Sequence, residues 1–149
     1  MLTRTLLLSI YMLFMPAFAG STASGVQIVN LRTEGMDTPL GLDEPRPYFS
    51  WQMASGRTGA LQRAYRVQVA LSQEDLQAGR LVFDSGMVRS DASLNIPYEG
   101  AALRPSTRYW WKVQVRDEQD ALTESAPTWF ETGLMGSGWS RAQWIGSQE

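Results

Sequence analysis

Hydrophobic and polar residues alternate most regularly near the end of the chain, in the segment LRPSTRYWWKVQV (residues 103–115). Tyr109, Trp111, Val113 and Val115 occupy every second position, and polar or amphipathic residues separate them. This period of two predicts a β-strand with one buried face and one face toward water. A tyrosine near the start of such a strand, preceded by a proline, is typical of a tyrosine corner. In that motif the hydroxyl contacts the backbone a few residues upstream.

Six other segments predict further short strands, the first of them with an ambiguous facing. They are Val26–Leu31, Tyr48–Met53, Ala64–Leu71, Leu81–Phe83, Leu94–Ile96 and Thr128–Glu131. The alternation predicts these side chains to point inward: Phe49, Trp51, Met53, Tyr65, Val67, Val69, Leu71, Leu94, Ile96 and Phe130. It predicts these to point outward: Ser50, Gln52, Arg66, Gln68, Asn95, Lys112, Gln114 and Trp129. About seven short strands separated by turns favour an all-β sandwich.

The connections carry turn-forming residues and one short helical signal. Ser72 can cap a single helical turn, with Glu74 and Asp75 near its amino end, and Gly79 would end it. The run DEQDA (117–121) predicts the turn of a hairpin, with Thr128–Glu131 as the returning strand.

The first 19 residues have the features of a secretory signal peptide. Arg4 precedes an apolar run, Pro16 breaks it, and small residues flank Phe18 before a cut between Ala19 and Gly20. The run of about ten residues is shorter than the roughly twenty that span a bilayer. We therefore expect a secreted or periplasmic protein without a membrane anchor after cleavage, and a flexible lead-in over residues 20–25.

Charge and composition exclude several function classes. Without Arg4, 12 basic residues face 15 acidic residues, a net charge of −3, which argues against nucleic acid and anionic membranes as partners. The chain has no cysteine, so it must fold without disulfides. It also has no histidine, which excludes Ser-His-Asp and Cys-His catalysis and nearly every zinc site.

The acidic residues do not suggest a catalytic pair. They lie in a Pro/Gly-rich loop (Asp37, Asp43, Glu44), at a helix start (Glu74, Asp75), in a turn (Asp84) and at the hairpin tip (Asp117, Glu118, Asp120). Turn chemistry explains each position. The DEQD run lacks the spaced ligands of a calcium loop. We therefore predict no catalytic residue, no cofactor and no metal site in this chain.

The order of several blocks resembles a known family. TPLGLDEPRPYFSW, AYRVQVALS, LVFDSG, LRPSTRYWWKVQVRD, WFETGL and AQWIG together are similar to the amino-terminal module of bacterial α-L-rhamnosidases. The resemblance implies a seven-stranded fibronectin type III/immunoglobulin-like β-sandwich. It further implies a parent enzyme, an inverting glycoside hydrolase that removes terminal α-L-rhamnose and carries its catalytic carboxylates far downstream.

That resemblance also divides the chain. It implies a sandwich over residues 26–134, followed by a linker and the start of a truncated next module over residues 135–149, with Trp139, Trp144 and Ile145 as anchors of that module. The chain would then be a fragment whose partners are the downstream domains of the same polypeptide. No catalytic position of the family falls within it, so whether this chain alone is an enzyme stays open.

Trp110 and Trp129 supply the binding hypothesis. Both are predicted to point outward on neighbouring strands, where they would form one aromatic patch. Flat aromatics can stack on sugars, so the patch could bind rhamnosylated glycans in a free-standing glycan-binding or adhesion module. Exposed apolar patches more often mark interfaces, which favours docking against another domain of the parent enzyme.

Overall fold

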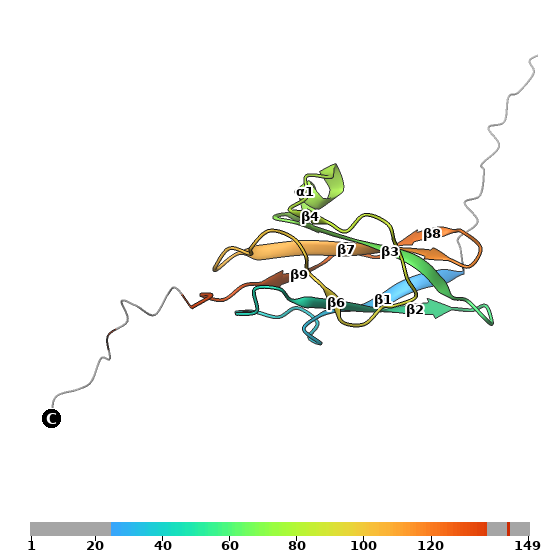
Figure 1. Ribbon diagram of the computed structural model, residues 1–149, viewed down its shortest axis with the longest axis horizontal. Coiled ribbons are helices and arrows are strands. Elements are labelled where there is room, and N and C mark those ends of the chain that lie inside the picture. The colour runs from blue at the N-terminus through green and yellow to red at the C-terminus, as the bar shows by residue number, and fades with distance from the viewer. Residues whose placement is uncertain (1–24, 137–142, 144–149) are drawn as a thin grey trace, which may run out of the picture.

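The computed structural model describes residues 25–136 and residue 143, and this part of the chain is built mainly of strands (Figure 1). In order the elements are β1 (Val26–Thr33), β2 (Tyr48–Ser55), β3 (Gln62–Ala70), α1 (Gln73–Ala78), β4 (Phe83–Asp84), β5 (Val88–Arg89), β6 (Ile96–Pro97), β7 (Arg108–Asp117), β8 (Leu122–Glu124) and β9 (Thr128–Glu131). The described residues thus contain nine strands rather than about seven, because the short β5 was not predicted and β8 forms as a strand separate from β9.

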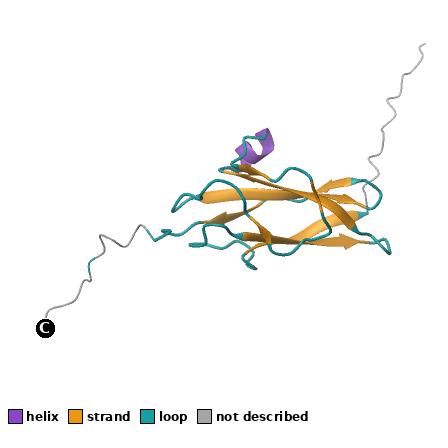
Figure 2. Ribbon diagram, in the orientation of Figure 1, coloured by secondary structure: helices purple, strands orange, loops and turns teal. Residues whose placement is uncertain are grey.

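Two antiparallel sheets face each other. One has the order β1-β2-β6, and the other contains β4-β3-β7-β8, with β5 pairing with β3 and β9 pairing with β7. Figure 1 shows these two layers, with α1 on the outer side of the larger sheet. The one helix within residues 25–136 is small beside the strands (Figure 2), and the predicted all-β sandwich is confirmed.

The core lies between the sheets and is built from the inward faces of β2, β3 and β7. Six side chains that the alternation places on the inward faces of these strands are buried, as predicted: Trp51, Tyr65, Val67, Tyr109, Trp111 and Val113. Phe49 of one sheet lies 4.5 Å from Trp111 of the other, measured between ring centroids. The alternation along β7 therefore determines which residues join the two layers.

The returning strand of the predicted hairpin is divided. The turn after β7 leads first into β8, which pairs with the end of β7, and then into β9, which pairs with its beginning. Between them Ser125 exchanges hydrogen bonds with the backbone of Val113, through both its amide and its hydroxyl. Phe130 is fully buried, as predicted.

Two predictions about β3 were wrong. Leu71 is 39% exposed, because β3 ends at Ala70 and Leu71 already belongs to the turn before α1. Gln68 faces outward but is only 7% exposed, because β4 pairs beside it at Asp84 and closes over this part of the sheet. Arg66, Lys112 and Gln114 are likewise half-buried rather than exposed.

The segment around Asn95 also differs from its prediction. Leu94 is 67% exposed, and Asn95 has a φ of 54°, so the alternation from Leu94 to Ile96 breaks at a left-handed residue. Pro97 is part of β6, where it lies opposite Tyr48. The strand expected at Leu81–Phe83 starts two residues later and covers Phe83–Asp84.

The caps of α1 are confirmed. The Ser72 hydroxyl accepts a hydrogen bond from the Asp75 amide at 3.0 Å, and Gly79 ends the helix with a φ of 72°. Only a residue without a side chain adopts that conformation at no steric cost. Leu76 is buried and fastens this short helix to the sheet.

Candidate functional site

Trp110 and Trp129 lie side by side on the outer face of the larger sheet. They are direct partners in the register of β7 and β9, and both side chains are half-buried. Their surroundings are polar. The Arg108 guanidinium lies 4.1 Å from the centroid of the Trp129 ring, and it also pairs with Glu131 at 3.0 Å. One face of Trp129 is therefore already occupied by a cation.

The helix α1 borders this tryptophan pair. It contacts both β3 and β7, and Ala70, the residue opposite Trp110 in the register, is fully buried. Both rings are thus partly covered rather than freely exposed. Such a surface suits apolar contact with another protein layer better than stacking on both faces of a sugar.

A second candidate region is the end of the sandwich at which the chain leaves it. Here the tyrosine corner forms as predicted, with the Tyr109 hydroxyl accepting a hydrogen bond from the Arg104 amide at 2.8 Å. The Thr132 hydroxyl donates to the Arg104 carbonyl at 2.6 Å, and the Ser106 amide donates to the Gly133 carbonyl at 2.8 Å. The loop before β7 is therefore fixed to the residues just beyond β9.

The loop between β1 and β2 covers the other side of this exit segment. Leu42 and Thr132 form a parallel bridge. The backbone amide of Glu131 donates to Pro39, that of Leu42 to Glu131, and that of Gly133 to Leu42, at 2.9, 2.9 and 2.8 Å. These bonds protect the free edge of β9, which would otherwise be open to pairing with another chain. Leu40, in the same loop, is 68% exposed.

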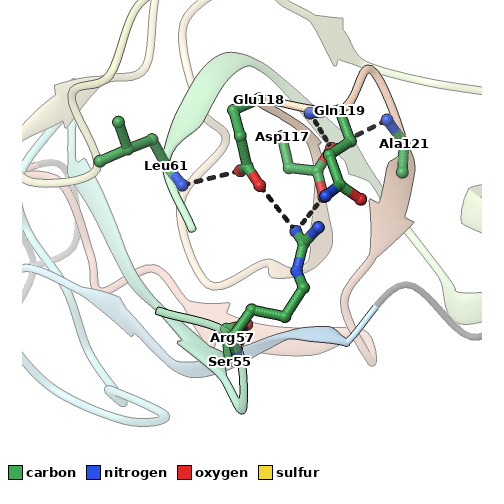
Figure 3. Close-up of polar contacts among 7 residues, drawn as sticks. All are labelled: Ser55, Arg57, Leu61, Asp117, Glu118, Gln119 and Ala121. Atoms are coloured by element: carbon green, nitrogen blue, oxygen red, sulfur yellow. Dashed lines mark hydrogen bonds and ion pairs between the residues drawn. The ribbon is translucent and has the colours of Figure 1, made fainter. Parts of the chain in front are cut away.

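At the opposite end of the sandwich, the Arg57 side chain joins the turn after β2 to the turn after β7 through ion pairs with two carboxylates (Figure 3). Its guanidinium contacts Asp117 Oδ2 at 2.8 Å and Glu118 Oε1 at 3.0 Å. Asp117 Oδ1 accepts the amides of Gln119 and Ala121, both at 2.9 Å, and Glu118 Oε2 accepts the Leu61 amide at 2.9 Å. Every carboxylate oxygen of this cluster has a partner, so its role is to hold the two turns together.

Asp117 was assigned from the sequence to a solvated hairpin tip, and that prediction was wrong. Its side chain is only 1% exposed. The signal was present in the alternation itself, because continuing the inward set Tyr109, Trp111, Val113, Val115 by one step reaches Asp117. Its partner Arg57 could not be found in this way, because it lies in a turn without periodicity.

The carboxyls with shifted pKa values lie in structural contacts. A hydrogen bond from Arg66 lowers the pKa of the Asp84 carboxyl, and one from Arg80 lowers the pKa of Asp75. The Leu61 amide lowers the pKa of Glu118. Burial raises the pKa of the Tyr65 and Tyr98 hydroxyls. These carboxyls thus stay ionised and the phenols neutral, which is the reverse of the raised carboxyl pKa that a general acid requires.

No group of three or more acidic side chains within residues 25–136 is arranged to hold a metal ion. Over the same residues, no helix is long and apolar enough to cross a bilayer. Ala19, Gly20, Trp139, Trp144 and Ile145, which the sequence assigns to signal cleavage and to anchoring a next module, lie outside the described residues.

The chain is similar to one family of modules. Residues 28–136 match the family model described as the Rha78A-like, N-terminal immunoglobulin domain. An alpha-L-rhamnosidase of Streptomyces avermitilis is 46% identical over 82% of this chain and 12% of its own length. One of Formosa agariphila is 36% identical over 72% of this chain and 12% of its own length.

Solved structures give the same result. The crystal structure of the Streptomyces avermitilis alpha-L-rhamnosidase complexed with L-rhamnose matches 83% of this chain and 12% of that protein, with a TM-score of 0.78 and 44% identity. The alpha-L-rhamnosidase of Dictyoglumus thermophilum matches 83% of this chain and 14% of that protein, with a TM-score of 0.77 and 36% identity. The chain therefore spans only about an eighth of the length of these relatives.

Proposed function

Because the chain belongs to the family of Rha78A-like N-terminal immunoglobulin domains, we propose that it is the non-catalytic accessory module of a secreted α-L-rhamnosidase. In this proposal the catalytic carboxylates lie in downstream domains of the same polypeptide. The module stabilises and positions the catalytic unit. The family match over residues 28–136, joined to the small share of each relative that the chain covers, is the observation that carries the proposal.

The chemistry of the described residues supports a role without catalysis. The carboxyls with shifted pKa values are all shifted downward by hydrogen-bond donors, as in structural ion pairs. Inverting hydrolysis needs a protonated acid and a base on opposite sides of a sugar. The network around Arg57 has no free oxygen to offer a substrate.

We assign the tryptophan pair, Trp110 and Trp129, to docking against a downstream domain. The pair is half-buried on the outer face, and Arg108 already covers one face of Trp129. Glycan binding by the same pair is the competing assignment. Binding of rhamnosylated glycans that is lost when both residues are changed to Ser would replace docking with that function.

Hydrolysis of a chromogenic α-L-rhamnoside tests the proposal. We expect no turnover by the purified chain, and turnover by the longer polypeptide that contains it. Activity of the chain alone that survives repurification, and disappears when one of its Asp or Glu residues is replaced, would refute the accessory role.

Export is tested separately. The apolar run and the small residues before Gly20 support a cut after Ala19. We expect mass spectrometry of the exported protein to find Gly20 as its first residue. Material that starts at Met1 in the medium or the periplasm would contradict this part of the proposal.

A further inference from the structure

The segment by which the chain leaves the sandwich contains a contact between residues far apart in the sequence. Asp43 Oδ1, in the loop between β1 and β2, accepts a hydrogen bond from the Met135 amide at 2.9 Å, across 92 residues. Shortly before Met135, the backbone amide of Gly133 donates to Leu42. The exit segment is thus bound to this loop once through the backbone and once through a carboxylate.

Gly133 is required for this approach. A Cβ atom at residue 133 would lie 2.4 Å from Asp43 Oδ1 and 2.8 Å from the Gly41 carbonyl oxygen. Real Cβ atoms essentially never come so close, and the Gly41 oxygen belongs to the backbone, so it moves only if the loop moves. A side chain at residue 133 would therefore separate the loop from the exit segment.

The contact precedes a turn. Met135 and Gly136 have φ values of 50° and 73°, so the chain bends sharply through left-handed conformations just after the amide that Asp43 holds. The left-handed conformation has a steric cost at Met135, which its hydrogen bond to Asp43 offsets.

We propose that Asp43 and Gly133 form a latch that fixes the direction in which the chain leaves the sandwich. This exit latch depends on the proposed function in one respect, because the downstream module that it would orient belongs to that proposal. Leu42, which is buried in the core, anchors the loop independently of the latch. Opening the latch therefore frees the Met135 amide from this loop, while the hydrogen bond between Ser106 and Gly133 and the sandwich stay in place.

Amide hydrogen exchange by NMR on the purified chain tests the latch. In Asp43→Ala we expect exchange at Met135 to become roughly tenfold faster or more, as for loss of a charge-assisted bond. Gly133→Ala should accelerate exchange at Met135 and at the amide of residue 133, which donates to the Leu42 carbonyl. Asp43→Asn, which keeps an oxygen acceptor, should retain most of the protection.

Asp37→Ala is the matched control, because Asp37 lies in the same loop with a side chain that is 77% exposed. It should leave exchange at Met135 unchanged. Unchanged protection at Met135 in folded Asp43→Ala would overturn the proposal, and so would equal losses in Asp43→Ala and Asp37→Ala. If Gly133→Ala does not fold, the Asp43 variants still decide. None of these measurements depends on rhamnosidase activity, so the latch and the accessory role can fail separately.

Discussion

At the residue scale, Trp111 is the side chain that most directly joins the two sheets. It is fully buried on β7 and packs against Phe49 of β2. Its indole N–H has no hydrogen-bond partner. A buried donor without a partner costs about 1–3 kcal/mol. The apolar packing of the Trp111 ring therefore offsets this cost in addition to providing the residue's net stabilisation.

This gives a prediction with an internal control. Trp111→Ala should lower the free energy of unfolding by about 3–5 kcal/mol, because it leaves a cavity between the sheets. Trp111→Phe should lower it much less, because it keeps an aromatic ring and removes the unpaired N–H. Denaturant unfolding measures both. A loss below about 1 kcal/mol for the alanine variant would contradict this packing of Trp111 between the sheets.

Single residues were predictable where neighbouring strands impose a strict alternation. The buried faces of β2, β3 and β7 follow from the sequence for this reason. Leu71 and Leu94 were assigned wrongly because each lies just outside the regular backbone, one after the last residue of β3 and the other before the left-handed Asn95. Alternation gives the facing of a strand but not the residue at which the strand stops.

At the scale of elements, the turn between β2 and β3 is held to the turn between β7 and β8. Arg57 makes this connection through Asp117 and Glu118 (Figure 3). Asp117 also stabilises its own turn by accepting two backbone amides. One carboxylate thus fixes the geometry of two hairpins.

Asp117→Ala should therefore destabilise the protein strongly. Removing one partner of a buried pair costs about 3–5 kcal/mol, and the partial exposure of Arg57 favours the lower end. Asp120→Asn is the control, because the Asp120 side chain is 81% exposed and asparagine tolerates the left-handed backbone at this residue (φ 65°), so the change should stay within about 0.5 kcal/mol. Thermal or denaturant unfolding compares the two, and equal effects would show that the Arg57 network is unimportant for stability.

The pairing of β3 with β4 predicts a dependence on pH. Arg66 lowers the pKa of Asp84 from its ordinary value of 3.8. The stabilisation from Asp84 is therefore complete above that value, and it is lost as the pH falls through the lower pKa of the folded state. In Asp84→Asn the free energy of unfolding should decrease less steeply on acidification. If the free energy of unfolding of Asp84→Asn falls just as steeply on acidification, the pH dependence arises instead from Asp75 and Glu118, whose pKa values are also lowered.

Elements were predictable where caps or alternation mark them. The caps of α1 are an example, because Ser72 and Gly79 act within a few residues of the helix that they bound. The division of the returning strand into β8 and β9 was missed, because it depends on how Ser125 bonds to Val113 across the sheet. Such a bond does not change the alternation of hydrophobic and polar residues, so the sequence pattern does not reveal it.

At the scale of the whole molecule, the tryptophan pair leads to a prediction about assembly. Trp110→Ser combined with Trp129→Ser should weaken association between this module and the separately produced remainder of the parent polypeptide. Isothermal titration calorimetry would measure the affinity. Leu122→Ser is a suitable control, because Leu122 is 50% exposed on β8, away from the pair. Equal losses in the control and the double variant would contradict docking through the pair.

The contacts that hold the molecule together at its two ends could not be predicted. Arg57 and Asp117 are 60 residues apart, and Asp43 and Met135 are 92 residues apart. Hydrophobic periodicity is a local property, whereas these pairs depend on which loops the completed sandwich brings together. The turn residues that form them look, in the sequence alone, like ordinary solvated turns.

The described chain enters the sandwich at β1 and leaves it after β9 at the opposite end (Figure 1). A tension applied between those two points would act along the strands. The antiparallel register of β1 with β2 then places several hydrogen bonds under load together, so they must break in concert. Forced extension is governed by the rate of unfolding rather than by equilibrium stability. Pulled between these two points, the sandwich should therefore resist extension until the hydrogen bonds between β1 and β2 break together.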